Sequence, residues 1–280
     1  MKYEKIVQAK FIERENRFVA TVELAGSEGR GNNRNKRNNC NKCDKTVNVH
    51  VKNTGRCREL LVPGSTVYLE DFDGRMGNRK MRYSLVAVEK AVSRCAGVDE
   101  TLLVNMDSQA PNKVVQEAIE DGRIRLPGLN DSDDDRFTLI KPETRYGDSR
   151  FDFYVEAVSE AGEAVSKAGE ADGAPKRAFI EVKGVTLEDN GHARFPDAPT
   201  ERGVKHINEL IRARREGYLA YILFMVQMEG MKEVSPNYET HPEFGEALAK
   251  AAEAGVEILA YDCKATPDTL TINKQIEFCL

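Results

Sequence analysis

The sequence lacks any long run of apolar residues, and it lacks an apolar segment near its N-terminus. No stretch of the 280 residues approaches the roughly 18 to 20 consecutive apolar residues that span a bilayer. The first residues carry scattered charges instead of an apolar core followed by a cleavage site, so they do not resemble a secretory signal. These absences predict a cytoplasmic protein with no membrane partner, and they leave its oligomeric state open.

An excess of positive charge and a disulfide framework are lacking as well. The net charge of -5 argues against a uniformly basic nucleic-acid-binding protein, although a local basic patch is compatible with it. The six cysteines are spread along a chain that is large enough to fold without cross-links, so we expect reduced thiols. With 40% hydrophobic and 31% charged residues, the composition is that of a globular protein with a core, and the length allows two domains.

The first part of the chain shows the alternation of apolar and polar residues that is typical of half-buried strands. Val47, Val49 and Val51 illustrate this period of two. Segments of this kind recur five times in roughly the first 90 residues, and five short strands are typical of a small barrel. We therefore predict an oligonucleotide-binding (OB) type barrel over residues 1–85.

Residues 26–45 interrupt these strands with a segment that contains no aliphatic residue and is rich in Asn, Gly and Arg. Such a segment cannot bury a core, which predicts a loop. Its basic residues could contact phosphates, or they could simply be the solvated tip of a hairpin. Cys40 and Cys43 form a lone Cys-x-x-Cys, which would bind zinc only if two further ligands came from elsewhere.

From residue 86 the pattern changes to helices that alternate with apolar strands, which indicates an α/β layer structure. We therefore predict a second domain over residues 86–280. The expected helices cover residues 111–122, 201–216 and 242–255, and the expected strands cover residues 150–158, 177–187, 218–227 and 256–264. The Ala-, Gly- and Glu-rich residues 159–176 are expected to connect two strands as a long hairpin loop.

Charged residues lie within two of the apolar strands of this second domain. Asp152 lies inside one of them, and Glu181 and Lys183 lie two residues apart on the next, where they point to the same face. Carboxylates in apolar surroundings are unfavourable unless a cation or another partner satisfies them. Mg²⁺ or Mn²⁺ would do so, because such ions prefer oxygen ligands, and the backbone carbonyl of Val182 could add a third.

This arrangement predicts a phosphodiester-hydrolysing site in which the ion polarises the phosphate and activates water, while Lys183 orients that water or neutralises developing charge. By itself, Glu-x-Lys also occurs as an exposed ion pair on a solvated strand. The pattern Asp, then Glu-x-Lys on the following strand, resembles that of the PD-(D/E)XK nuclease superfamily. In that resemblance Asp152, Glu181 and Lys183 match the catalytic core, and Glu143 matches an accessory acidic residue.

Two further segments are candidates for contact with nucleic acid. Arg202 and His206 are four residues apart on an expected helix, with Lys205 on the same basic face. They could reach one phosphate or a metal-bound water, or form an ordinary exposed face. In the barrel, Asn53 and Arg56 belong to a polar turn that could approach a phosphate backbone or be a plain turn between strands.

Seven sequence blocks, in order along nearly the whole chain, resemble the bacterial and archaeal sugar fermentation stimulation protein A family. They are VKNTGRCRELLVPGSTVYLED, RKMRYSLVAVEK, NMDSQAPNKVVQEAI, ETRYGDSRFDF, FIEVKGVTL, FPDAPTERGVKHINEL and GVEILAY. The resemblance implies an OB-type barrel followed by a PD-(D/E)XK nuclease-like mixed-sheet domain, with DNA binding and a DNA or RNA nuclease role. The chain departs from the superfamily pattern at Phe151, where a Pro is usual, and in its long insertions at residues 26–45 and 159–176.

Two functions follow as hypotheses. The first is a Mg²⁺- or Mn²⁺-dependent nuclease that acts on DNA or RNA. The alternative is a non-catalytic DNA-binding regulator of sugar-utilisation genes of the maltose type, as the family name suggests. Paired carboxylates in an apolar strand favour the nuclease, because a protein that only binds nucleic acid does not need them.

Overall fold

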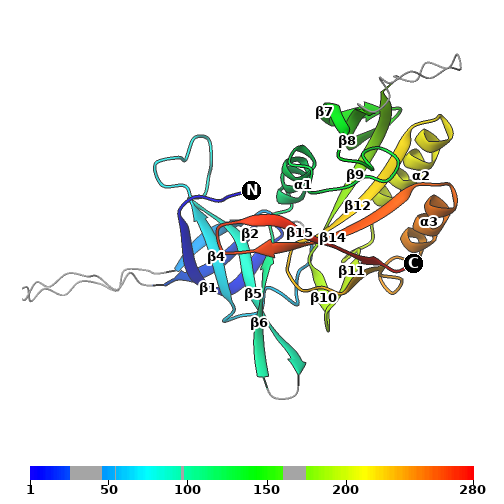
Figure 1. The fold of residues 1–280 in the computed structure, drawn as a ribbon. Coiled ribbons are helices and arrows are strands. Elements are labelled where there is room, and N and C mark those ends of the chain that lie inside the picture. The colour runs from blue at the N-terminus through cyan, green and yellow to red at the C-terminus, as the bar shows by residue number, and fades with distance from the viewer. Residues whose placement is uncertain (26–45, 54, 96–97, 160–174) are drawn as a thin grey trace, which may run out of the picture. The chain divides into compact units, whose positions relative to one another are not determined.

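The chain forms two compact units in a computed structural model that describes residues 1–25, 46–53, 55–95, 98–159 and 175–280 (Figure 1). The first unit comprises Lys2–Ser108 and Ala265–Thr269, and the second comprises Met1, Gln109–Lys264 and Leu270–Leu280. The expected boundary at residues 85 and 86 would cut strand β5 (Tyr83–Cys95). The first unit instead continues to Ser108, because β5 goes on to pair with the next strand.

Within the described residues, the first unit is a closed five-stranded barrel, as expected. Its other strands are β1 (Ile6–Asn16), β2 (Val19–Leu24), β3 (Thr46–Val51) and β4 (Thr66–Asp71). The strand order is β3-β2-β1-β4-β5, and a parallel pairing of β3 with β5 closes the barrel. Strand β6 (Val98–Asn105) extends β5 as an antiparallel hairpin.

The apolar side chains of the alternating sequence pattern fill the interior of the barrel. Ala20 and Val22 of β2 and Val49 and Val51 of β3 are buried, whereas the residues between them are more accessible. Strand side chains alternate between the two faces, so this period places the apolar residues inside. Strands β2 and β3 pair as an antiparallel hairpin. Cys40 and Cys43 lie outside the described residues.

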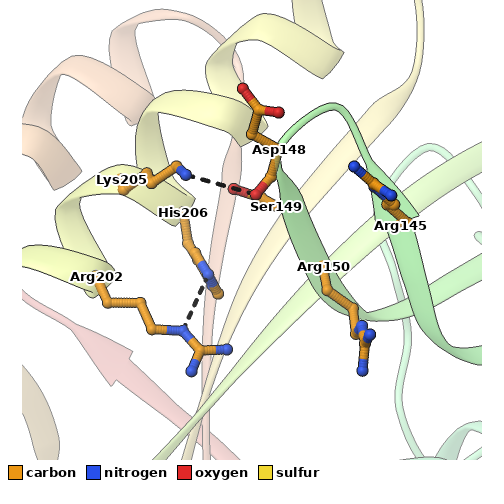
Figure 2. Close-up of a pocket in the computed structure, with 7 residues that line it drawn as sticks. All are labelled: Arg145, Asp148, Ser149, Arg150, Arg202, Lys205 and His206. Carbon is orange, nitrogen blue, oxygen red and sulfur yellow. Dashed lines mark hydrogen bonds between the residues drawn. The ribbon is translucent and has the colours of Figure 1, made fainter.

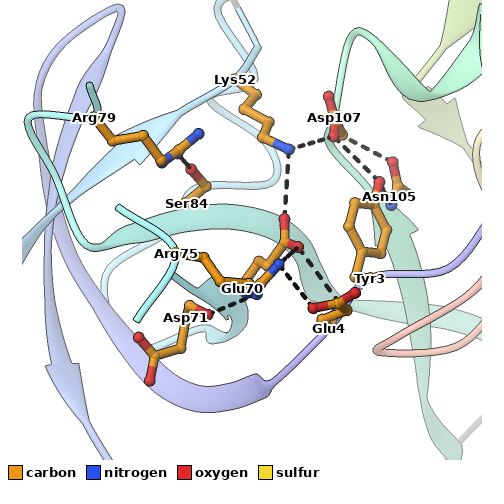
Figure 3. Close-up of polar contacts among 10 residues, drawn as sticks. All are labelled: Tyr3, Glu4, Lys52, Glu70, Asp71, Arg75, Arg79, Ser84, Asn105 and Asp107. Atoms are coloured by element: carbon orange, nitrogen blue, oxygen red, sulfur yellow. Dashed lines mark hydrogen bonds and ion pairs between the residues drawn. The ribbon is translucent and has the colours of Figure 1, made fainter. Parts of the chain in front are cut away.

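A polar network ties the barrel strands to the segment after β6 (Figure 3). The Lys52 ammonium lies 2.8 Å from Asp107 and 3.8 Å from Glu70 of β4. Asn105 donates a hydrogen bond of 3.0 Å to the Tyr3 hydroxyl. These groups are largely buried, and because each charge has an opposite partner, their burial is tolerated.

The second unit is built on a mixed sheet, which has nine strands in the part of the chain that is described. Its order is β10-β11-β13-β15-β14-β12-β9-β8-β7. The strands are β7 (Asp135–Tyr146), β8 (Ser149–Ser159), β9 (Lys176–Val185), β10 (Leu187–Asp189), β11 (His192–Phe195), β12 (Leu219–Val226), β13 (Glu233–Pro236), β14 (Glu257–Ala265) and β15 (Leu270–Phe278). Strand β12 lies between two parallel neighbours and is buried almost throughout, as its apolar sequence requires.

The three expected helices are present as α1 (Ala110–Glu120), α2 (Glu201–Arg215) and α3 (Pro242–Glu253) in the described residues. Helices α2 and α3 lie side by side, and α2 packs on β8, β9 and β12 (Figure 1). Helix α1 packs on β9 and β15. Thr200 caps α2 by accepting a hydrogen bond from the Gly203 amide. In the described part of the chain, we find no helix with the length and apolar character needed to cross a membrane.

Strands β8 and β9 form the expected antiparallel hairpin. Its connection, from residue 160 to residue 174, is outside the described residues. On the following strand β9, Glu181 and Gly184 are three residues apart and therefore lie on opposite faces of the sheet. Glu181 contacts His206 of α2. On the other face, a Cβ at Gly184 would meet Pro111 of α1 at 2.6 Å. The candidate residues of β9 therefore lie where helices pack on both faces of the sheet.

Candidate active site

The candidate site lies where the pairing of β8 and β9 ends. The strands pair from Ala157 with Lys176 to Phe153 with Ile180. In the same register the next pair would be Asp152 with Glu181. There the Val182 amide donates instead to the Asp152 carboxylate, at 2.7 Å. The end of the strand ladder therefore places the two predicted carboxylates next to each other.

Asp152 is held by neutral donors. Its Oδ1 accepts a 2.7 Å hydrogen bond from the Asn112 side-chain amide of α1, and its Oδ2 accepts the bond from Val182. Burial raises the pKa of Asp152 to about 6, with the charge of Glu181 acting in the same direction, and the two hydrogen bonds oppose this shift only in part. This carboxyl is therefore half protonated near pH 6 and mostly charged at pH 7.

Glu181 is buried, with 4% of its surface exposed, but its partners differ from those of Asp152. Its Oε1 lies 2.5 Å from the Lys183 ammonium and 2.6 Å from His206 Nδ1. Burial raises the pKa of Glu181, yet the hydrogen bond from His206 and the charge of Lys183 outweigh burial, so the pKa lies below its ordinary value. Glu181 therefore ionises at a lower pH than Asp152.

The second oxygen of Glu181 is an exception in this network. Oε2 is buried and has no hydrogen-bond partner among the described residues. Buried polar atoms are nearly always paired, and an ion or a water commonly accounts for an exception. Hard divalent cations prefer charged carboxylate oxygens of this kind, and Asp152 on the neighbouring strand offers a second carboxylate.

His206 is held in one orientation by its neighbours. Its Nδ1 donates to Glu181, because an ionised carboxylate can only accept. Its Nε2 accepts a 3.3 Å hydrogen bond from Arg202 Nε (Figure 2). The ring therefore faces Glu181 with Nδ1 and Arg202 with Nε2. Arg202, His206 and Glu181 form a chain of contacts from the surface of α2 to the buried carboxylate.

Glu143 and Val182, the other residues predicted for this site, are placed less centrally. The Glu143 carboxylate is 59% exposed and lies 3.5 Å from Arg150, and its backbone has a φ of 52° within β7. Val182 supplies its amide proton to Asp152 through the backbone. A metal-ligand role for the Val182 carbonyl and an accessory role for Glu143 stay predictions.

Arg202 and Lys205 line a pocket together with residues of the β7–β8 turn (Figure 2). The turn requires glycine at position 147, where φ is 53° and a Cβ would lie 3.3 Å from side-chain atoms of both Arg212 and Glu209 on α2. This close approach brings the turn against the second half of α2, and Lys205 in the first half donates to the Asp148 carbonyl. The predicted basic residues of the helix therefore face the turn rather than open solvent alone.

The predicted contact residues of the barrel turn differ in accessibility. Asn53 is 9% exposed, and its side-chain oxygen accepts a hydrogen bond from the Gly55 amide, so it shapes the turn itself. Arg56 is exposed. The Arg14 guanidinium fixes the backbone by donating to the carbonyls of Asn53, Gly55 and Arg56. Of the two predicted residues, only Arg56 presents its side chain to solvent.

The barrel also has a surface pocket of about 270 Å³ that combines aromatic and basic side chains. It is lined by Phe18, Val19, His50, Arg79, Lys80 and Met81. Phe18 is 50% exposed, which is unusual for a large apolar residue. An exposed ring beside cations is the combination on which single-stranded nucleic acids stack.

One further group of possible metal ligands lies elsewhere on the second unit. Single ligand atoms of Glu233, Glu277 and Cys279 lie within 4.8 Å of one another, and His192 Nδ1 lies 2.9 Å from Glu233. The hydrogen bonds from His192 and Cys279 lower the pKa of Glu233, and burial opposes them. These groups satisfy one another, so we do not place the candidate active site there.

Sequence reasoning missed Asn112 and the contact between His206 and Glu181. Asn112 follows the Pro111 that begins α1, and nothing in its local sequence points to Asp152, which is 40 positions away. His206 was predicted to reach a phosphate or a metal-bound water, or to belong to an exposed basic face; its side chain is buried against Glu181, and its contact with a phosphate or water stays a prediction. Its apolar neighbour Ile207 and its place near the buried stripe of α2 were the available signals.

Comparisons with known proteins match both units. Residues 12–98 match the model of the SfsA N-terminal OB domain, and residues 109–269 match that of the sugar fermentation stimulation protein RE domain. The chain is 44% identical over 280 residues to a sugar fermentation stimulation protein homolog of Clostridium beijerinckii, with 100% of both chains covered. It is 43% identical over 278 residues to the homolog of Ruminiclostridium cellulolyticum, with 99% of each covered.

A solved structure also resembles the whole chain. It is the structure of Pyrococcus furiosus SfsA in complex with Ca²⁺, which matches with a TM-score of 0.71 and 26% sequence identity. The match covers 100% of this chain and 98% of the other. Both family models, the full-length relatives and the solved structure agree, so this chain belongs to the sugar fermentation stimulation protein family.

Proposed function

We propose that this protein is a divalent-metal-dependent nuclease that hydrolyses phosphodiester bonds of DNA or RNA at Asp152, Glu181 and Lys183. The observation that carries the proposal is the buried, charged Glu181 carboxylate, which has one oxygen without a partner among the described residues and whose charge acts on Asp152. The related Pyrococcus furiosus protein is described in complex with Ca²⁺. That ion takes oxygen ligands, as Mg²⁺ and Mn²⁺ do, which supports a metal-binding role for this family.

The residues present fit a hard cation. Asp152 and Glu181 would hold it through carboxylate oxygens, and such an ion supplies Lewis-acid polarisation of a phosphoryl oxygen and lowers the pKa of bound water. Asn112 and the Val182 amide orient the Asp152 carboxylate. His206 orients Glu181 and leaves its second oxygen available.

Lys183 supplies the positive charge of the site. Its ammonium is held beside Glu181 and is only 13% exposed, so water screens it weakly. A cation fixed at this position stabilises the negative charge that develops on a phosphate during hydrolysis. In this proposal Lys183 is therefore the group that acts on the transition state, whereas His206 acts through Glu181 as a positioning residue.

The barrel would hold the nucleic acid. Support comes from the match to an OB domain and from the exposed Phe18 ring with Arg79 and Lys80 in one pocket. Stacking on an exposed ring tolerates any base, and cations follow the phosphate backbone. This proposal explains how a protein with a net charge of -5 could bind a polyanion through local surfaces.

A cleavage assay tests the proposal. Purified protein is incubated with single- and double-stranded DNA and RNA in Mg²⁺ or Mn²⁺, and Asp152→Asn, Glu181→Gln and Lys183→Ala are compared with the wild type. We expect each of these variants to lose cleavage by roughly 100-fold or more, because each lacks a group that holds the cation or stabilises charge. The control is Arg215→Gln, which removes an exposed charge from the last turn of α2.

The same assay separates binding from chemistry. Phe18→Ala should raise KM about tenfold with kcat little changed, since stacking of one base contributes about 1 to 3 kcal/mol. Ile12→Ala, which removes a 37% exposed side chain from the same barrel, is the matched control. Cleavage that survives in all three active-site variants would refute the assignment of the activity to Asp152, Glu181 and Lys183. Binding of nucleic acid without any cleavage would favour the regulator.

A further inference from the structure

The pocket beside α2 is the strongest candidate for a ligand site outside the carboxylate pair. It has a volume of about 370 Å³ and is lined by Arg145, Asp148, Ser149, Arg150, Arg202, Lys205 and His206 (Figure 2). The first four residues come from the β7–β8 turn and the last three from the first turns of α2. Because His206 also binds Glu181, the pocket adjoins the candidate active site.

The charge of this lining is strongly positive. Arg145 Nε donates to the Gly147 carbonyl, Lys205 Nζ to the Asp148 carbonyl, and Arg202 Nε to His206. These acceptors are neutral, and among the described residues no carboxylate lies within ion-pair distance of the three side chains. Their charge is therefore not cancelled locally.

The remaining charged residues of the lining do not change this conclusion. Arg150 has an acidic partner in Glu143, but both side chains are mostly exposed, with 64% and 59% of their surfaces accessible, so the pair is weak. Asp148 is exposed, and its side chain points away from the Arg202 guanidinium (Figure 2). The lining thus keeps an excess of positive charge, to which the N-terminal end of α2 adds.

A buried hydroxyl provides a second, independent observation. Ser149 is 5% exposed, and its Oγ has no hydrogen-bond partner among the described residues. Buried hydroxyl groups are normally paired. Since Ser149 lines the pocket, we expect this hydroxyl to find its partner in a ligand oxygen there.

We propose that this pocket binds the terminal phosphate monoester of a nucleic-acid strand. A terminal phosphate carries about -1.5 to -2 charges at neutral pH and offers three strong acceptor oxygens, whereas each internal phosphodiester carries one charge. The pocket matches a terminal monoester better than an internal phosphodiester, because, within the described residues, it offers arginines and a lysine without a local counter-charge and a hydroxyl without a partner. Guanidinium groups bind phosphate oxygens through paired hydrogen bonds.

The inference rests on the proposed nuclease function and specifies its substrate. A strand end bound beside His206 would lie close to Glu181, so cleavage would occur near phosphorylated ends. The phosphate could belong to the 5′ or the 3′ end, since both have the same chemistry. The test below distinguishes these two sources.

The test measures binding without cleavage. One labelled single-stranded oligonucleotide is prepared with a 5′-phosphate, with a 3′-phosphate and with hydroxyls at both ends, and its binding to the full-length protein is followed by fluorescence anisotropy in EDTA. We expect one phosphorylated form to bind about tenfold more tightly than the hydroxyl form, as charge-assisted contacts from a terminal phosphate would produce.

Variants assign that preference to the pocket. Ser149→Ala and Arg202→Gln should reduce the preference to less than about twofold, because each removes a donor to the phosphate. Arg215→Gln removes one positive charge from the same helix outside the pocket and should retain the preference. Thermal melting of each variant confirms that it is folded.

The outcomes separate this inference from the nuclease proposal. Equal binding of the three oligonucleotides, or a preference unchanged in both pocket variants, overturns the terminal-phosphate pocket even if Mg²⁺-dependent cleavage is observed. A preference that the two pocket variants abolish supports the pocket even if cleavage is absent. The readout in EDTA does not depend on catalysis.

Discussion

Asp152 and Glu181 occupy neighbouring buried positions, yet their pKa values shift in opposite directions. Asp152 accepts from the neutral donors Asn112 and Val182, so burial dominates and its pKa rises to about 6. Glu181 accepts from Lys183 and His206, which overcome its burial and lower its pKa. The partners of each carboxylate, rather than its depth, decide which one ionises first as the pH rises.

The raised pKa of Asp152 implies that this residue destabilises the metal-free fold at neutral pH. Its pKa is 3.8 in the unfolded chain and about 6 in the folded one, so the penalty is absent below pH 4, grows between pH 4 and 6, and is constant above. We expect Asp152→Asn, in EDTA, to raise the free energy of unfolding by about 3 kcal/mol at pH 7, since the pKa shift is about 2 units and each unit corresponds to about 1.4 kcal/mol.

Urea denaturation of wild type and Asp152→Asn at a series of pH values measures this difference in the free energy of unfolding. The two stabilities should converge as the pH falls to about 4. A constant difference across the pH range would show that Asp152 is not buried near Glu181 as described. Glu143→Gln serves as the control, because that carboxylate is 59% exposed and its loss should change stability little.

At the scale of the element, α2 positions His206 together with Arg202 and Lys205 of the pocket. Its start is fixed by Thr200, whose Oγ1 accepts a 3.0 Å hydrogen bond from the Gly203 amide. Loss of such a cap leaves a backbone N–H without its partner. The cap therefore links the stability of one helix end to the placement of the residues that contact Glu181.

We expect Thr200→Ala to lower the free energy of unfolding by about 1 kcal/mol, the usual contribution of an N-cap side chain. Thr200→Ser retains the oxygen and should lose less than half as much. Thermal or urea unfolding of the two variants measures the difference. Equal losses would mean that packing of the Thr methyl group, rather than the cap, holds the helix end.

The elements differed in how well their sequences predicted them. The cap, the apolar stripe and the following Gly217 fixed the bounds of α2 closely, and β12 was recognisable from its continuous apolar run. Strand β7 was missed because most of its side chains are exposed or only partly buried, so it lacks a clear alternation. Strand β15 was missed although Leu270, Ile272 and Ile276 repeat with the period of a buried face.

The site was predictable only in part, for a physical reason. Glu181 and Lys183 share a face because they are two apart on one strand, and this local rule was sufficient to pair them. The juxtaposition of Asp152 with Glu181 needs the register of β8 and β9, and the Asn112 contact needs the docking of α1. Such long-range contacts leave no local pattern in the sequence.

At the scale of the whole molecule, two units divide the proposed work. The barrel carries the exposed Phe18 ring and basic side chains, and the mixed-sheet unit carries the carboxylate pair and the basic pocket. The match of the two family models to residues 12–98 and 109–269 follows the same division. The boundary at Ser108 differs from the expected one because the β5–β6 hairpin belongs to the barrel.

The most direct measurement is a calorimetric titration of the full-length protein with Mg²⁺, repeated with Mn²⁺, at pH 8, where Asp152 is ionised. We expect saturable binding to the wild type and to Arg215→Gln, and affinity reduced at least about tenfold in Asp152→Asn and Glu181→Gln, since each variant lacks a charged oxygen ligand. Unchanged metal binding in both carboxylate variants, or no binding to the wild type, would contradict a cation site between these two residues.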